Sequence, residues 1–188
     1  MTDLPALIGA VAGGFALLGF VPYLLTMVRG KTRPNRASWW IWTVIGTLLA
    51  GSYYATGARD SLWVPLSYVV GPLLTALLAM KYGEGGWTRL DRACFAGAGG
   101  SLLLWVVSGS PLAATLVNIL IDIFGAVPTI RKSYTDPESE DRLSWGLFLV
   151  GDTLNLFAIR PWSLETAIYP LYLFGLAGLI TVLLARRG

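Results

Sequence analysis

The sequence predicts an all-α integral membrane protein in which seven transmembrane helices form two parallel three-helix repeats joined by a linker helix. Composition is the first of three observations that predict this fold class. The chain is 55% hydrophobic and 13% charged over 188 residues, and its charges cluster between long neutral stretches. A soluble all-helical domain is the alternative, but neutral runs of roughly 20 residues match a bilayer span better than a globular core. The other two observations are the distribution of basic residues and an internal repeat.

Seven apolar segments are long enough to cross the membrane, because about 20 helical residues span about 30 Å of hydrocarbon. The long neutral stretch 93–121 exceeds one span, and we divide it at 108–111, where Ser-Gly-Ser-Pro supplies turn chemistry. Pro111 is suited to the first turn of a helix. We expect spans at Leu4–Val28, Ala37–Ala58, Ser61–Met80, Leu90–Val107, Leu112–Ile130, Leu143–Ile159 and Ala167–Ala185.

Basic residues test this count, because they favour the cytoplasmic side of short loops. With the N-terminus outside and the C-terminus cytoplasmic, only Arg59 and Arg160 lie on the outer side. Six or eight spans would spoil this alternation. The net charge of +3 is then explained by membrane topology, without a nucleic-acid partner. The inner segments hold Arg29, Lys31, Arg33, Arg36, Lys81, Arg89, Arg92, Arg131, Lys132, Arg142, Arg186 and Arg187.

The third observation is a pattern that recurs at an offset of 106 residues. The same offset continues without a gap over roughly 80 residues, as expected for a duplicated chain. Spans one and five both begin outside, so the halves are parallel repeats. We expect a first repeat at 1–82, a linker helix at 83–108 and a second repeat at 109–188. The matched residues are Pro22, Arg36, Ser38 and Trp39 in the first half and Pro128, Arg142, Ser144 and Trp145 in the second.

In this layout the chain resembles the SWEET sugar transporters and the wider PQ-loop (MtN3/saliva-like) superfamily. The shared features are the three-plus-one-plus-three order, the outside N-terminus and a proline in the first helix of each repeat, the place of Pro22 and Pro128. Lys31-Thr32 and Lys132-Ser133 resemble the basic and hydroxyl pair that often follows that proline. The Gln of the PQ motif is replaced here by Tyr23 and Thr129. The resemblance implies a full-length, seven-helix transporter that works by alternating access.

The repeated residues have two interpretations each. Pro22 and Pro128 are predicted hinges, since proline removes a backbone hydrogen bond and kinks a helix, although such kinks can be purely structural. Ser38, Trp39, Ser144 and Trp145 are predicted to form a symmetric cytoplasmic gate. The alternative is that the serines cap helices and the tryptophans belong to the interfacial belt.

Two acids within the spans are the most costly residues of the chain. Asp122 and Asp152 lie near the middle of spans five and six, where an ionised carboxylate costs at least about 2.5 kcal/mol. Asn118 and Asn155 lie one turn away on the same helix faces. The constellation is confined to the second repeat, because the first repeat has Ala12, Ala16, Gly46 and Leu49 at the corresponding positions.

With no Lys or Arg at that depth, these carboxylates are expected to be protonated for part of a cycle, to face a water-filled cavity, or to bind a cation. In some PQ-loop proteins that export amino acids with protons, a Trp-containing helix start is followed by a midplane Asp, and Ser144, Trp145 and Asp152 resemble that pattern. We hypothesise that Asp152 couples transport to protons and that Asp122, Asn118 and Asn155 line the substrate cavity. The alternative is that the acids serve helix packing through hydrogen bonds.

Five aromatic residues could complete the pocket by stacking on a sugar or another flat ring. Trp63 and Tyr169 are more simply explained as interfacial belt residues. Tyr68 and Tyr172 lie deeper in the third helix of their repeats and are the preferred candidates. Trp42 is the fifth.

The function that we expect is transport of a small polar solute, such as a sugar, an amino acid or a vitamin, with membrane lipid and protons as further partners. A seven-helix receptor or sensor with a SWEET-like fold and no transport is the alternative. An enzyme is not expected, because the chain has no His and a single Cys94, so the usual triads and zinc sites are missing. We expect no cofactor, no metal, a monomer or homo-oligomer, and the inner membrane of a bacterial cell.

Overall fold

The computed structural model describes residues 3–57 and 59–186, without the side chains of residues 90, 91, 94, 95, 98, 99, 101, 102 and 105. Ala58, the predicted end of the second span, and Arg187 lie outside the described residues. Seven α-helices and one short 3-10 helix make up the described fold, with an isolated bridge between Asn35 and Glu84 and no strand. The helices are α1 (Leu4–Val28), α2 (Arg36–Ala55), α3 (Trp63–Tyr82), α4 (Arg89–Ser108), α5 (Pro111–Thr135), η1 (Pro137–Ser139), α6 (Arg142–Ala158) and α7 (Leu164–Ala185).

Each predicted span overlaps one of these helices, so the all-α class is confirmed, although α2 ends at Ala55 and α7 begins at Leu164. By length and composition, α1, α3, α5 and α7 are the described helices that could cross a membrane. The count of seven spans stays a prediction. The outward faces of these helices expose Leu7, Leu77 and Val182, as expected for surfaces that meet lipid rather than water.

The fifth helix extends beyond the predicted span, because the prediction ends at Ile130 and α5 continues to Thr135. Charge marks where a span leaves hydrocarbon, but Arg131 and Lys132 are good helix formers and do not stop the helix. The last turn of α5 therefore projects two basic side chains beyond the apolar segment.

Helices α2 and α6 begin in the same way. The side chain of Asn35 caps α2 by accepting from the backbone N–H of Ser38 at 3.1 Å, and Asp141 caps α6 by accepting from that of Ser144 at 2.8 Å. Asn35 and Asp141 are themselves 106 residues apart. The alternative that Ser38 and Ser144 are the caps is wrong, since each is the third residue of its helix.

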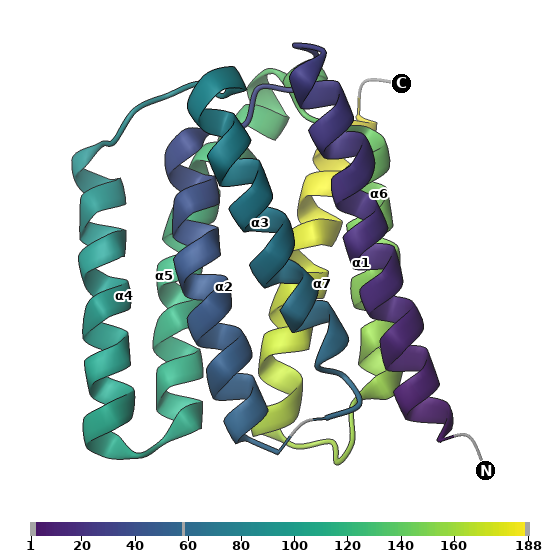
Figure 1. The fold of residues 1–188 in the computed structure, drawn as a ribbon, viewed down its shortest axis with the longest axis vertical. Coiled ribbons are helices and arrows are strands. Elements are labelled where there is room, and N and C mark those ends of the chain that lie inside the picture. The colour runs from purple at the N-terminus through teal and green to yellow at the C-terminus, as the bar shows by residue number, and fades with distance from the viewer. Residues whose placement is uncertain (1–2, 58, 187–188) are drawn as a thin grey trace.

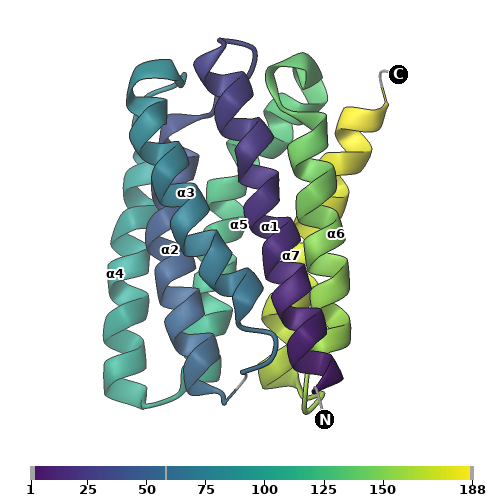
Figure 2. The same ribbon diagram turned by 45° about the vertical axis from the view of Figure 1, so that its right-hand side comes forward.

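Consecutive helices run in alternate directions, and the two termini lie at opposite ends of the bundle (Figure 1). The connections at 29–35, 83–88 and 136–141 and the end of α7 gather at one end, which we call the basic end. Helix α3 packs against both α1 and α2, and α7 packs against both α5 and α6. The groups α1–α3 and α5–α7, the two triads, meet where α1 packs on α6 and α2 on α5. Helix α4 lies at the edge, against α5 and α2 (Figure 2).

The interface between α1 and α6 is close because small residues line it. A Cβ built on Gly151 would lie 2.9 Å from the carbonyl oxygen of Ala12 and 3.0 Å from the backbone nitrogen of Ala16, so only glycine fits there without a shift. Ala12 and Ala16 are fully buried. Asn118 and Asp122 of α5 correspond to Ala12 and Ala16 at the offset of 106 residues. Side chains of that size would not fit in the interface between α1 and α6.

We expect Gly151→Ala to destabilise the fold, because the added methyl group meets backbone atoms of α1 that cannot turn away. Overpacking of this kind costs about 1–3 kcal/mol. Gly146→Ala, in the same helix, is the matched control, since its Cβ would meet nothing within 4 Å. Thermal unfolding in detergent should show a lower midpoint for Gly151→Ala and an unchanged or higher one for Gly146→Ala; equal midpoints would contradict the close α1–α6 packing.

Candidate functional site

A cavity of about 50 Å³ lies inside the bundle, with walls from both triads. It is smaller than a typical small-molecule site of about 300–1,000 Å³, so a solute enters it only if the surrounding side chains move apart. It borders a buried aromatic cluster that includes Phe20, Trp39, Trp42, Trp145 and Phe148. The residues that line it are Trp39, Trp42, Gly46 and Leu49 of α2, Tyr68 and Pro72 of α3, Asp122 of α5, Trp145 and Phe148 of α6, and Tyr169, Leu173, Leu176 and Ala177 of α7.

The two buried acids Asp122 and Asp152 each accept a hydrogen bond from a tyrosine. Asp122 lines the cavity, and its Oδ2 accepts from the Tyr172 hydroxyl of α7. Asp152 is buried, and its Oδ2 accepts from the Tyr68 hydroxyl at 3.2 Å. Tyr68 belongs to α3 and Asp152 to α6, so this second pair joins the two triads. The structure thus brings four predicted pathway residues together as two tyrosine–aspartate pairs.

Several buried polar atoms near the cavity have no hydrogen-bond partner among the described residues. They are the indole Nε1 atoms of Trp39 and Trp42 and the Oδ1 atoms of Asp152 and Asn155. An unsatisfied buried polar group costs about 1–3 kcal/mol, so such groups are rare in interiors that serve packing alone. Their presence indicates an interior that is completed by water, a proton or a ligand.

Asn118 and Asn155 are buried on the same helices as the acids, and the cavity wall is formed without them. Pro22 and Pro128 lie inside α1 and α5 and are also absent from the wall. Their hinge role stays a prediction. Sequence reasoning missed Pro72, which lies inside α3 and lines the cavity. A proline within a span is visible in the sequence, but Pro72 has no partner at the repeat offset to draw attention to it.

The aromatic assignments change in one respect. Tyr169 is 1% exposed and lines the cavity, so its interpretation as a belt residue is wrong. Trp63 is 54% exposed, as a belt residue would be. Trp39 and Trp145 are buried and line the cavity, which contradicts the belt alternative for them. Sequence depth alone could not separate Trp63 from Tyr169, because both lie near the same end of the bundle and differ only in which helix face they occupy.

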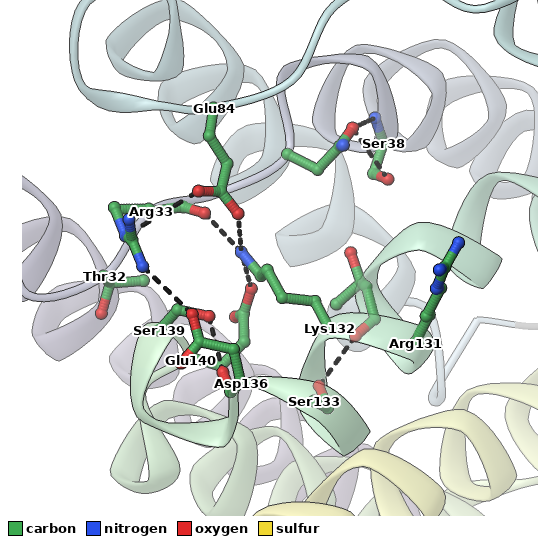
Figure 3. A network of polar contacts seen from close by, with 12 residues as sticks. Thr32, Arg33, Ser38, Glu84, Arg131, Lys132, Ser133, Asp136, Ser139 and Glu140 are labelled. Atoms are coloured by element: carbon green, nitrogen blue, oxygen red, sulfur yellow. Dashed lines mark hydrogen bonds and ion pairs between the residues drawn. The ribbon is translucent and has the colours of Figure 1, made fainter.

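A network of charged side chains joins the connections of the basic end (Figure 3). The Nζ atom of Lys132 lies 2.8 Å from Oε1 of Glu140 and 3.5 Å from Oε1 of Glu84, and it donates to the carbonyl oxygen of Arg33. The Arg33 guanidinium lies 3.0 Å from Asp136 and 3.8 Å from Glu84. The network joins the α1–α2, α3–α4 and α5–α6 connections, so both triads must stay together at this end while it is intact.

Glu140 connects this network to the cavity. Its side chain is fully buried, and its Oε2 accepts from the Tyr23 hydroxyl at 2.9 Å and from Nε1 of Trp145 at 3.2 Å. Trp145 lines the cavity, so one carboxylate contacts both the ion pair and the wall. The predicted gate residues Ser38 and Ser144 are buried without lining the cavity, and the Ser38 hydroxyl donates to the carbonyl oxygen of Gly125 at 2.9 Å.

Sequence reasoning missed Glu140 because it stands in a charged connection, where acids are usually solvated. One signal was available. Glu140 directly precedes the cap residue Asp141, and its counterpart in the first half is Pro34, so it is another acid that only the second half carries.

Comparison of the chain with protein-family models, with curated proteins and with solved structures finds no match. The residues of the cavity and of the network at the basic end therefore carry the functional conclusion. Within the part of the chain that the structure describes, no three Cys, Asp or Glu residues form a group that could hold a metal ion.

We expect Glu140→Gln to open the basic end, because it leaves the Lys132 ammonium without its buried counter-charge. Removing one partner of a buried ion pair costs about 3–5 kcal/mol, and about 1.4 kcal/mol already changes an equilibrium tenfold. The measurement is maleimide labelling of the buried Thr129→Cys in a Cys94→Ser background. The labelling rate should rise at least about tenfold.

Glu138→Gln is the control for this change, since Glu138 is an exposed acid of the same connection. It should leave the labelling rate unaltered. An equal rate in the Glu140→Gln and Glu138→Gln variants would show that the Lys132–Glu140 pair does not hold the basic end closed.

Proposed function

We propose that the chain is a membrane transporter that moves a small polar solute, such as a sugar, an amino acid or a vitamin, by alternating access. The observation that carries this proposal is the cavity between the two triads, which has a buried acid in its wall and a network of ion pairs across one end. A closed end next to an internal site is the arrangement that an occluded or one-sided state of a transporter requires.

The contacts between helices support the proposed duplication. In each triad the third helix packs against the first and the second. Between triads, the first helix of one packs on the second helix of the other, as α1 on α6 and α5 on α2. A two-fold exchange of the triads reproduces both contacts, which is the relation expected of parallel repeats around a linker, here α4. The basic end is then the cytoplasmic end, by the excess of Lys and Arg in its connections.

Alternating access needs two arrangements of the triads. Opening the basic end would break the ion pairs of Lys132 and Arg33 and would move Trp145 with α6. Pro22 and Pro128 would absorb the change in α1 and α5, since proline lacks the hydrogen bond that stiffens a helix. The breaking ion pairs would exchange their partners for water, so the two arrangements can be close in free energy.

Proton coupling is proposed to act through Asp152. Its hydrogen bond with Tyr68 joins α6 of the second triad to α3 of the first. Protonation removes a buried negative charge and adds a donor, so the two protonation states favour different partners for this carboxyl group. A carboxyl group in contact with both triads can therefore bias their relative position, which is what coupling requires.

The arrangement of two triads around α4 supports the proposed kinship with the SWEET and PQ-loop transporters, and the proposed location is the inner membrane of a bacterial cell. Reconstitution into liposomes with a panel of sugars, amino acids and vitamins tests the proposal. Flux of at least one solute is expected. Ligand-induced thermal stabilisation without flux of any solute would favour the receptor alternative.

Once a transported solute has been identified, we expect Asp152→Asn to abolish the acceleration of its uptake by a pH gradient, because asparagine cannot take up or release a proton. Uptake without a gradient should persist, since asparagine keeps the shape and can still accept from Tyr68. Uptake is measured in liposomes with equal and unequal pH on the two sides.

Glu165→Gln, an exposed acid in the first turn of α7, serves as the control and should keep the full response to the gradient. Gradient-driven uptake by Asp152→Asn that equals that of the unaltered chain would remove Asp152 from the coupling role.

A further inference from the structure

We propose that the solute of this cavity is a small organic cation, an ammonium group that carries methyl or methylene groups and no carboxylate. In this assignment the Asp122 carboxylate provides the counter-charge and the surrounding aromatic rings provide the walls. The inference rests on the proposed function and narrows its solute to one chemical class.

The charge of the wall is the first observation. Asp122 is the one charged residue among the described residues that line the cavity. Behind the wall, Asp152 is bonded to the lining residue Tyr68. Among the described residues, both acids accept side-chain hydrogen bonds from tyrosine hydroxyls, which are neutral. The basic side chains of the network at the basic end, Lys132 and Arg33, are already paired with acids of that network. An ionised Asp122 therefore gains no counter-charge from them, and a cation that enters the cavity would supply one.

The arrangement of the rings is the second observation. The rings of Trp39 and Trp42 are 5.0 Å apart at 90°, and those of Trp42 and Trp145 are 6.3 Å apart at 71°. Trp145 and Phe148 follow at 5.5 Å and 85°. Successive rings are thus packed edge to face in one cluster, and all four also line the cavity, so a solute there meets several aromatic rings. Aromatic faces attract cations, and a box of several such faces is the usual recognition element for methylated ammonium groups.

The other solute classes fit this wall less well. A sugar brings many hydroxyl groups, each of which loses water on entry and needs a partner. Apart from Asp122, the polar side-chain groups of the wall are tyrosine hydroxyls and indole N–H groups, and the Tyr68 hydroxyl already donates to Asp152. A free amino acid brings a carboxylate, which would meet Asp122 without a basic lining residue to balance it. A methylated ammonium needs one negative charge and apolar surroundings, and the wall offers both.

The test compares ligands that differ in charge and hardly in shape. Choline and 3,3-dimethylbutan-1-ol share the same hydroxyethyl arm and the same three methyl groups, around nitrogen in the first and carbon in the second. Their binding to the purified full chain in lipid nanodiscs is followed by tryptophan fluorescence and by calorimetry, with tetramethylammonium as a second cation. At least one cation should bind at least about tenfold more tightly than the neutral alcohol.

Three variants locate the site. Asp122→Asn and Trp42→Leu should each weaken binding of the cation by at least about tenfold, the first by removing charge and the second by removing a ring face. Trp63→Leu is the control, because Trp63 is an exposed aromatic residue outside the wall, and it should leave affinity unchanged. If Asp122→Asn does not fold, the comparison of the two ligands on the unaltered chain and the Trp42→Leu variant still decide the question.

Equal binding of the alcohol and the cations, or no binding of either cation up to about 10 mM, would overturn the proposal. So would cation binding that Asp122→Asn and Trp42→Leu leave intact. These outcomes differ from a failure of the transporter proposal. Cation binding without flux in liposomes would contradict transport and keep the cation site, whereas flux of a neutral sugar without cation binding would keep transport and remove the cation site.

Discussion

The rest of the structure depends on one constraint, the burial of Asp122 and Asp152, which accept side-chain hydrogen bonds from the tyrosine hydroxyls of Tyr172 and Tyr68. An unpaired carboxylate in an apolar interior is expensive, so such residues are found where charge enters and leaves. Here the cost is reduced by hydrogen bonds from Tyr68 and Tyr172. One of these bonds crosses from α6 to α3, so the protonation of a single group bears on how the two triads meet.

The two halves of the chain differ at the buried acids of the candidate site. At the positions of Asn118 and Asp122, the first half has Ala12 and Ala16, and these small residues allow α6 to approach α1 closely at Gly151. The matching interface of α5 with α2 borders the cavity instead. Glu140 and Lys132 also belong to the second half alone, since the first half has Pro34 and Thr26 at the corresponding positions. Matched residues such as the cap pair Asn35 and Asp141 build the frame, and the matched pair Trp39 and Trp145 forms part of the cavity wall. The buried acids, in contrast, are unmatched.

Much of the fold could be predicted from the sequence, because apolar length and turn chemistry fix where a membrane helix can begin and end. All seven predicted segments are helices, and Pro111 starts α5 as expected. The end of α5 could not be predicted in this way, since Arg131 and Lys132 limit a span without limiting a helix. Three sequence signals pointed to residues of the site. The cost of burying an acid indicated Asp122, depth within a predicted span indicated Tyr68, and recurrence at the offset of 106 residues indicated Trp39 and Trp145. Glu140 and Tyr169 were not, because their burial depends on contacts between helices that no local pattern reports.

The central claim is that the cavity opens in turn to each side of the membrane. Its most direct test is side-specific labelling of Leu173→Cys, a residue of the cavity wall, in a Cys94→Ser background with a maleimide that cannot cross the membrane. The account predicts labelling from either side, and a transported solute should slow both reactions. Labelling from one side only, under every solute and pH condition, would contradict alternating access and identify the cavity as a fixed binding site.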